Sequence, residues 1–237
     1  RDAGSEFTWL SRSIPEDVYD YALTLHSIRK VFASDFAQGP CLPETTVRRA
    51  MMLRERHDDD EVLLLGDDDL VGLTLAKMGG VATVVDIDQR LLDFIEARAT
   101  EAGIDIRTMR HDISEPLPEE LLTRFGAVIT DPVPHEKWFD IWLPRCSSAL
   151  VSGGRIYLAT YPRYEGLTRH EIAKFGLIEE EMWRGYSHYY DERLKHDPSW
   201  DSNMFVIGGS DAALSAAAST KTTDADLFEF ADILAME

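Results

Sequence analysis

The 237-residue sequence predicts an α/β fold built on a doubly wound, mostly parallel sheet. The main observation is the stretch Glu61–Gly72, which reads EVLLLGDDDLVG. Its four apolar residues run unbroken from Val62 to Leu65 into Gly66, as in a strand that is buried on both faces, and a helical pattern follows. From there strands and helices alternate regularly, and such βαβ order implies right-handed crossovers between parallel strands.

A helical extension, residues 1–60, is predicted ahead of this strand. Pro15 stands at a typical first helical position, and apolar residues recur at helical spacing after it. Pro43 opens a second helical pattern in the same way. We therefore predict helices over 15–32 and 43–56.

Residues 61–210 are predicted to form a Rossmann-like domain that carries the chemistry. Buried apolar runs predict further strands at 82–86, 104–109, 127–130 and 155–160, with a final pair within 176–190 and 203–207. Helical patterns predict helices at 70–78, 88–102, 135–150 and 168–175. Residues 211–237 are predicted to lie outside the domain, with the small and polar segment 212–223 as a linker and an acidic tail after it.

The charge balance restricts the class of partner. The formal net charge is −19, from 43 acidic against 24 basic residues. Nucleic acid is not predicted as a partner, because phosphate binding needs a basic face. An acidic field can steer a cationic substrate such as a polyamine, and it can equally be a solubility trait of the source organism.

Cysteine usage and hydropathy predict a cytoplasmic protein without a metal. Cys41 and Cys146 are too few and too far apart for a disulfide scaffold or a zinc site, and no set of His, Cys and carboxylates shows a metal spacing. No apolar run reaches the roughly 18 residues of a membrane-spanning helix, so no membrane partner is predicted. The sequence leaves the oligomeric state open, and a homodimer is one possibility.

Three consecutive carboxylates, Asp67, Asp68 and Asp69, follow Gly66 at the turn between the first strand and its helix. A dinucleotide fold has glycines here, so that backbone N–H groups can hold a pyrophosphate. Three carboxylates would instead repel pyrophosphate and attract a cation. S-adenosylmethionine and its decarboxylated form are nucleosides with a sulfonium, an ammonium and no phosphate, so either fits this turn as co-substrate. Helix capping is the structural alternative.

The ends of the next two strands carry further candidates for donor binding. Asp86 ends the second strand about 20 residues after the turn, where an acidic residue typically binds ribose hydroxyls. Asp112, after the third strand, could accept a hydrogen bond from an adenine amino group, with Ile87 and Ile113 on either side of the ring. The alternative of helix capping suits Asp88 better than Asp86.

The fourth strand runs into Asp131-Pro132-Val133-Pro134. Two prolines fix the backbone, so a carboxylate at a strand end is held rigidly over the cleft. Such a carboxylate can orient an attacking amine and take its proton. We predict this role for Asp131 and place Pro132 in the donor-binding set. An Asp-Pro turn without a role is the alternative.

Aromatic side chains gather late in the chain, and their faces can stabilise sulfonium and ammonium groups. Tyr161 and Tyr186 are the candidates, because each follows a predicted strand or lies at its edge. The hydrophobic core is the alternative location for all of these rings, which also include Trp138, Trp142, Trp183, His188, Tyr189 and Tyr190.

Five stretches together resemble the branched-chain polyamine synthase family, including N4-bis(aminopropyl)spermidine synthase. They are TTVRRA (45–50), LGDDDL (65–70), VVDIDQRLL (84–92), DISEPLP (112–118) and Thr130-Asp131-Pro132. The resemblance covers roughly residues 38–160 and implies a class I methyltransferase-like fold. Where the family usually has Asp-Pro-Pro, this chain has Val133 before its second proline.

The resemblance implies aminopropyl transfer from decarboxylated S-adenosylmethionine to a polyamine nitrogen, with 5′-methylthioadenosine released. By it, Asp67–Asp69 and Asp86 would bind the donor and Asp131 would handle the amine. Four alternatives remain open: transfer of the 3-amino-3-carboxypropyl group of intact donor, its cyclisation to azetidine-2-carboxylate, ordinary methyl transfer, and a non-catalytic nucleoside-binding module or interaction protein. Intact donor needs a cation for its carboxylate, which Arg163 or Arg184 could supply.

Overall fold

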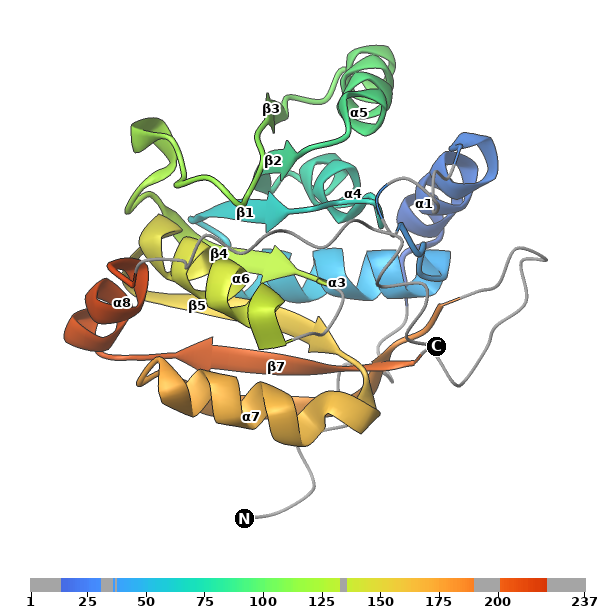
Figure 1. The fold of residues 1–237 in the computed structure, drawn as a ribbon. Helices are drawn as coiled ribbons and strands as arrows, with labels where there is room; N and C mark the ends of the chain where they lie inside the picture. The colour runs from blue at the N-terminus through green and yellow to red at the C-terminus, as the bar shows by residue number, and fades with distance from the viewer. Residues whose placement is uncertain (1–13, 31–35, 37, 133–135, 190–200, 221–237) are drawn as a thin grey trace.

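The computed structural model describes residues 14–30, 36, 38–132, 136–189 and 201–220. A seven-stranded sheet has the order β3-β2-β1-β4-β5-β7-β6 (Figure 1). Neighbouring strands are parallel from β3 to β5, whereas β7 is antiparallel to both β5 and β6. The predicted doubly wound, mostly parallel sheet is therefore confirmed.

The elements occur in the predicted order, but β5 begins at Leu150 instead of residue 155, and α1 ends at Ile28 instead of residue 32. The strands are β1 (Glu61–Leu65), β2 (Val81–Asp86), β3 (Arg107–Arg110), β4 (Phe125–Thr130), β5 (Leu150–Thr160), β6 (Ile178–Ser187) and β7 (Ser202–Gly208). The α-helices are α1 (Glu16–Ile28), α3 (Pro43–Arg56), α4 (Val71–Lys77), α5 (Gln89–Ala102), α6 (Glu136–Ala149), α7 (Glu165–Lys174) and α8 (Asp211–Ala218). Two short 3-10 helices are η1 (Glu119–Leu121) and η2 (Pro162–Tyr164).

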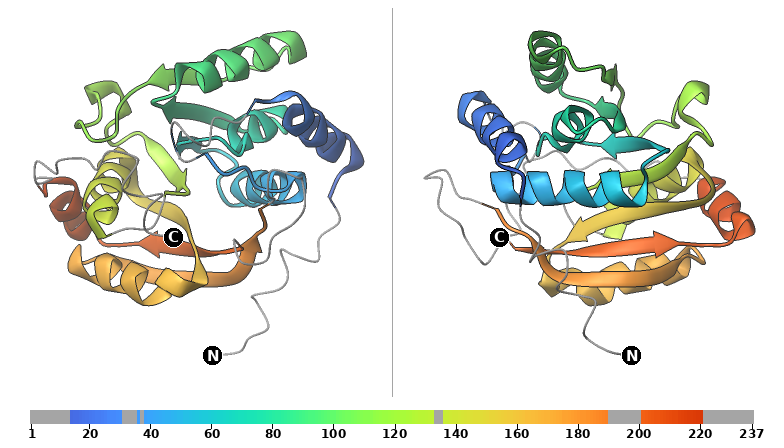
Figure 2. Two further views of the ribbon diagram at one scale, coloured as in Figure 1. Left: turned by 45° about the vertical axis from the view of Figure 1, so that its right-hand side comes forward. Right: turned by 180° about the vertical axis from the view of Figure 1, so that it is seen from behind.

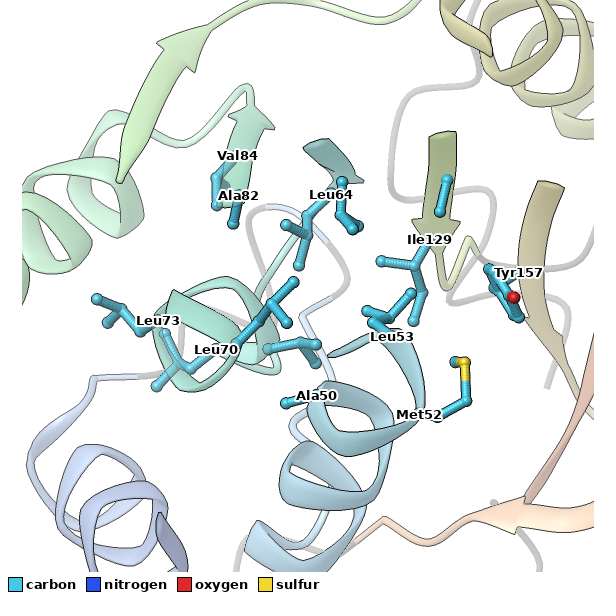
Figure 3. Close-up of a cluster of buried hydrophobic side chains, with 14 of the residues drawn as sticks. Ala50, Met52, Leu53, Leu64, Leu70, Leu73, Ala82, Val84, Ile129 and Tyr157 are labelled. Atoms are coloured by element: carbon cyan, nitrogen blue, oxygen red, sulfur yellow. The ribbon is translucent and has the colours of Figure 1, made fainter. Parts of the chain in front are cut away.

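Alternate residues of the central strands enter two different hydrophobic cores. Leu64 and Ile129 point to one face of the sheet, where they pack with residues of α3 and α4 such as Leu53 and Leu70 (Figure 3). Leu65 belongs to the other core, which α6, α7 and α8 close. This two-sided burial is why the strand reads as an unbroken apolar run.

Helices cover both faces of the sheet (Figure 2). On one face α3 packs against α4 and α1. Leu25 of α1 and Ala50 of α3 are buried in the same core as β1, so the N-terminal helices complete that core. The division of the chain into domains at residues 60 and 210 stays a prediction.

The prediction of a linker over 212–223 is wrong for its first part, because Asp211–Ala218 form helix α8. Ser210 caps this helix by accepting a hydrogen bond from the Ala213 amide at 3.2 Å. Alanine has the highest helix propensity, and Leu214 and Ala217 are buried against the domain. The acidic tail predicted after it lies outside the described residues. No helix in the described part of the chain has both the length and the apolarity to cross a membrane.

Strand β1 lies between β2 and β4, where the strand order reverses. From β1 the chain proceeds outward through β2 and β3, and then returns to build β4 and β5 on the opposite side. The carboxyl ends of β1 and β4 therefore diverge into connections on opposite faces and leave a crevice between them.

Candidate active site

A cavity of about 340 Å³ opens at this crevice. Ten residues predicted from the sequence as donor-binding or catalytic line it: Gly66, Asp67, Asp68, Asp69, Asp86, Ile87, Asp112, Ile113, Asp131 and Pro132. The sequence positions scatter over nearly 70 residues, and parallel strands bring them together because their carboxyl ends share one edge of the sheet. The roles assigned to these residues stay predictions; their common location is established.

Gly66 opens the turn at the end of β1. Its φ is +72°, a left-handed conformation that glycine adopts without strain. A Cβ added there would lie 3.8 Å from the Trp142 ring and 4.0 Å from a carboxylate oxygen of Asp86. Glycine therefore allows the turn and leaves free the narrow space between these two side chains.

The first aspartate of the turn caps a helix. Asp67 is 2% exposed, and its two oxygens accept hydrogen bonds from the amides of Val71 and Gly72 at 2.8 and 2.9 Å. Both amides belong to the first turn of α4, where backbone donors lack partners within the helix. Burial raises the pKa of the Asp67 carboxyl well above its usual range. The capping alternative is thus correct for this residue.

The third aspartate of the turn is an anchor for other protein groups. Asp69 is 3% exposed and accepts a hydrogen bond from the amide of Cys41 at 2.6 Å. Its second oxygen is 2.6 Å from the guanidinium of Arg49. These contacts occupy the carboxylate and compensate its charge, so Asp69 offers a ligand little of its own charge.

The middle aspartate is the most accessible of the three. The side chain of Asp68 is 23% exposed and accepts a hydrogen bond from the Gly39 amide at 2.8 Å. The buried guanidinium of Arg29 lies 3.7 Å away. Burial and the neighbouring Asp69 raise the pKa of the Asp68 carboxyl to about 7, against a lowering influence from Arg29. Its charge therefore responds to pH near neutrality and to any cation placed in the cavity.

Asp86 and Asp88, at the end of β2, make different contacts. Asp88 caps α5, since its side chain accepts from the Arg90 amide at 3.0 Å, as expected for this alternative. Asp86 accepts from the Asp88 amide at 2.8 Å, and its other oxygen is the one that faces Gly66. Burial raises the pKa of Asp86. A carboxylate with one oxygen facing the turn is suited to accept hydrogen bonds from a ribose diol.

The residues that follow β2 and β3 add apolar side chains to the cavity lining, which suit a flat ring. Ile87 follows β2 and is 37% exposed although it is apolar. Ile113 follows β3, and both side chains line the cavity. Asp112 also lines the cavity and holds its loop by accepting a hydrogen bond from the Ser114 amide at 2.9 Å. An exposed carboxylate beside apolar side chains can receive an amino group of a base.

Asp131 is the first residue after β4 and has 22% of its side chain exposed. Its Oδ2 accepts hydrogen bonds from Arg49 Nη2 at 2.7 Å and from the hydroxyl of Tyr189. Burial and the negative charge of Asp69 raise the pKa of the Asp131 carboxyl, and the Arg49 guanidinium opposes them. Pro132 behind it is buried in the cavity wall. Val133 and Pro134 lie outside the described residues.

The two predicted tyrosines have different locations. Tyr161 is half-buried, with its ring centroid 6.4 Å from that of Tyr189, and burial together with the charge of Asp131 raises its hydroxyl pKa. Tyr161 therefore lies beside the Asp131 carboxylate, outside the cavity lining. Tyr186 is 1% exposed in the hydrophobic core, and its hydroxyl donates to the Arg48 carbonyl at 3.2 Å. The structure does not bring Tyr186, predicted as a catalytic residue, into the cavity lining, because its ring packs on Trp183 instead.

Both tryptophan rings of the cavity come from α6, and Phe36 adds a phenyl ring from a segment before α3. Trp138 and Trp142 lie one turn apart on α6 and both line the cavity. Of the late aromatic cluster, Tyr189 contacts Asp131, His188 and Trp183 lie outside the lining, and Tyr190 is not among the described residues.

Sequence reasoning missed Arg49, which lines the cavity with its side chain only 2% exposed. A signal was present: Arg49 stands four residues from both Thr45 and Leu53 in the helix, which are fully buried. A charged residue on the buried face of a helix requires a partner, and here there are two carboxylates.

The cations suggested for a donor carboxylate are elsewhere. Arg184 donates to Glu165 at 3.0 Å, and Arg163 stacks over the rings of Tyr161 and Tyr164 at 5.3 and 5.1 Å. Neither lines the cavity. Across the described residues, no three His, Cys, Asp or Glu side chains are grouped as metal ligands.

Comparison with known proteins identifies relatives of this chain and solved structures that share its fold. The N(4)-bis(aminopropyl)spermidine synthase of Thermococcus kodakarensis is 33% identical over 175 residues, which are 66% of this chain and 48% of that protein. The branched-chain polyamine synthase of Thermus thermophilus, solved with N4-aminopropylspermidine and 5′-methylthioadenosine, superposes with a TM-score of 0.77 at 24% identity, over 92% of this chain and 70% of that one. A ribosomal protein L11 methylase from Lactobacillus delbrueckii shares the fold at a TM-score of 0.53 and 16% identity, over 70% of this chain and 79% of that one.

The chain spans about half the length of the curated relatives that it matches. The family model of the branched-chain polyamine synthase A C-terminal domain matches residues 18–204, which include most of α1, all of α3, strands β1 to β6 and the start of β7. The cavity and the acidic turn lie within this range. The chain belongs to the family of the branched-chain polyamine synthase A C-terminal domain.

Proposed function

We propose that this chain transfers an aminopropyl group from decarboxylated S-adenosylmethionine to an amine, and that it releases 5′-methylthioadenosine. The relatives named N(4)-bis(aminopropyl)spermidine synthase and the product complex of the Thermus thermophilus enzyme support this reaction. The observation that carries the proposal is one cavity lined together by apolar side chains, an acidic turn and a strand-end carboxylate.

The nucleoside occupies the part of the cavity at the ends of β2 and β3. Asp86 accepts hydrogen bonds from the ribose hydroxyls, and Ile87 and Ile113 contact the faces of adenine. Asp112 accepts from the adenine amino group. The sulfonium then lies toward Trp142 and the acidic turn, where an aromatic face and the Asp68 carboxylate favour positive charge.

The charges of the cavity favour the decarboxylated donor over the intact one. Arg49 is the one arginine among the described residues that line the cavity, and its guanidinium is already paired with Asp69 and Asp131. The carboxylate of intact S-adenosylmethionine would meet other carboxylates without a cation to compensate it. Decarboxylation removes this repulsion and leaves an ammonium, which Asp68 can pair.

The transfer itself is an in-line displacement. The nitrogen lone pair of the acceptor amine forms a C–N bond to the propyl carbon beside the sulfonium, while the C–S electron pair moves to sulfur and yields neutral 5′-methylthioadenosine. The amine must lose one proton, and Asp131 accepts it at the end of β4. Because both substrates are held in one cavity, positioning supplies much of the rate. A polyamine such as spermidine is the acceptor class that the acidic cavity favours.

Product analysis tests this function. We expect methylthioadenosine only when decarboxylated donor and spermidine are both present, together with a product heavier by one aminopropyl group, as measured by mass spectrometry. S-adenosylhomocysteine from intact donor would identify an ordinary methyltransferase. Methylthioadenosine with azetidine-2-carboxylate from intact donor alone would identify a cyclase. Either result would overturn the proposal.

The affinity for the donor should depend on pH through Asp68. Its carboxyl has a pKa of about 7, and only the ionised form pairs with the donor ammonium. Protonation therefore competes with binding, so affinity should fall by up to about tenfold per pH unit below 7 and level off above it. Calorimetry between pH 5.5 and 8.5, about 1.5 units either side of this pKa, measures the slope.

Asp68→Asn should remove most of this slope and leave the lower affinity at every pH. Methylthioadenosine is the matched control ligand, because it is neutral and lacks the aminopropyl ammonium. Its affinity for the unchanged chain should vary little over the same range. An equal slope for both ligands would show that another group governs the pH dependence.

A further inference from the structure

Arg49 connects four segments of the chain that are distant in sequence. It extends from α3 and lies 2.6 Å from Asp69 in the turn after β1 and 2.7 Å from Asp131 at the end of β4. The same guanidinium donates to Ser187 Oγ at 2.7 Å and to the Tyr189 hydroxyl at 2.9 Å, both at the end of β6. Figure 2 shows β6 rising toward α3. Every one of these contacts is buried or partly buried.

The contacts on Asp131 are asymmetric. The hydrogen bonds that described residues make to its carboxylate, from Arg49 and from Tyr189, both end on Oδ2. The Tyr189 hydroxyl is held in turn by Ser202 Oγ at 3.1 Å. Asp131 lines the cavity with 22% of its side chain exposed, and Oδ1 is the oxygen that these two donors do not engage.

The segment that carries Tyr189 is itself fastened to the start of α3. The Leu42 amide donates to the His188 carbonyl at 2.7 Å, and the His188 amide donates to Thr45 Oγ1 at 2.9 Å. Cys41 and Tyr189 form an isolated antiparallel bridge. The clamp on Asp131 therefore has rigid supports on both sides.

We propose that Arg49 and Tyr189 are positioning residues for the step in which the acceptor amine attacks the donor. They fix Oδ2 of Asp131 so that Oδ1 receives the proton of the amine. Arg49 also sets the distance between this carboxylate and the donor turn through Asp69. The inference rests on the proposed function, since it assigns Asp131 the proton. It adds two residues outside the predicted site to the machinery of that reaction.

The clamp also controls the protonation of Asp131. The titratable and charged groups that face Asp131 come from α3, the turn after β1, and the ends of β5 and β6: Arg49, Asp68, Asp69, Tyr161 and Tyr189. The hydrogen bond from Tyr189 lowers the Asp131 pKa and the negative neighbours raise it. Loss of the Tyr189 hydroxyl must therefore raise the pKa of Asp131 and move the acid limb of the rate profile to higher pH.

Arg49→Lys tests the geometry of the clamp. Lysine keeps the charge but cannot reach both carboxylates with a planar fork, so Asp131 moves relative to the amine. We expect kcat to fall about 100-fold, while the affinity for methylthioadenosine stays unchanged. Arg54→Lys is the matched control on the same helix, because Arg54 pairs with Asp58 outside the cavity. It should leave both quantities unchanged.

Tyr189→Phe tests the proton step with little change in packing. We expect kcat to fall roughly tenfold, the value of one hydrogen bond to a charged group. The acid limb of kcat/KM should shift upward, as should the carbon-13 NMR titration of the Asp131 carboxyl, assigned by its loss in Asp131→Asn. Tyr157→Phe is the control, since that buried hydroxyl bonds to His57 at 2.9 Å, away from the cavity.

The two readouts separate the possible failures. If the unchanged chain turns over and Tyr189→Phe keeps its pH profile and rate, the positioning role is overturned. If the unchanged chain releases no methylthioadenosine with any amine, the proposed function fails. The carboxyl titration then decides the clamp independently: an upward shift in Tyr189→Phe supports it, and an unshifted titration overturns it.

Discussion

Asp131→Asn should lower kcat by about 10²–10⁴-fold, the usual contribution of a general base. The amide oxygen can still accept the hydrogen bonds of Arg49 and Tyr189, so the side chain keeps its place. Its NH₂ group then faces the cavity, where it can accept no proton from the amine. The nucleoside contacts made by Asp86 and Ile87 are untouched, and methylthioadenosine should bind as tightly as before.

Single-turnover kinetics with decarboxylated donor and spermidine measure this loss, and calorimetry with methylthioadenosine measures the retained binding. Asp140→Asn is the matched control, because Asp140 on α6 pairs with Lys174 at the surface. Unchanged turnover in Asp131→Asn would exclude Asp131 as the proton acceptor. An equal loss of rate and of methylthioadenosine affinity would show that Asp131 only maintains the donor site.

Arg49→Met should destabilise the fold by about 3–5 kcal/mol, because it leaves the buried Asp69 and the partly buried Asp131 without a compensating charge. The pKa of Asp131 is already raised, and loss of Arg49 raises it further. Stability tied to a raised carboxyl pKa is complete below the unfolded value and is lost as pH rises through the folded value. The deficit relative to the unchanged chain should therefore be larger at pH 8 than at pH 5.

Urea denaturation at these two pH values gives the free energy of unfolding for each variant. Replacement of all three charges, by Arg49→Met with Asp69→Asn and Asp131→Asn, should recover much of the loss, since no buried charge then lacks a partner. Arg54→Met on the same helix should cost far less, because its guanidinium is partly exposed. A deficit independent of pH would mean that Arg49 stabilises by packing alone.

The element order could be predicted from the sequence because burial on both faces leaves a local signature. Val62–Leu65 is apolar without interruption because alternate residues enter two cores, and the helix α3 begins and ends at the predicted residues. The prediction of a linker over 212–223 is wrong for a local reason as well. The small residues indicate a linker, whereas the capping Ser210 and the buried Leu214 stabilise a helix over Asp211–Ala218.

The location of the site could also be predicted, since the carboxyl ends of parallel strands must meet at one edge. Asp86, Asp112 and Asp131 follow three different strands and line one cavity. Which aspartate of the turn faces a ligand could not be predicted. Asp67 and Asp69 are adjacent to Asp68 in sequence, but the first bonds to α4 and the third to Arg49.

The sequence by itself determined the α/β fold class and which strand ends carry candidate site residues. These are a turn with three carboxylates, acidic strand ends and an Asp-Pro step. Only the tertiary structure decided which groups compensate these charges. Arg49 and Tyr189 are 140 residues apart and meet at Asp131 because β6 returns to α3. Local patterns record periodicity and turns, whereas the partner of a buried charge is chosen by long-range packing, which leaves no signature in either segment alone.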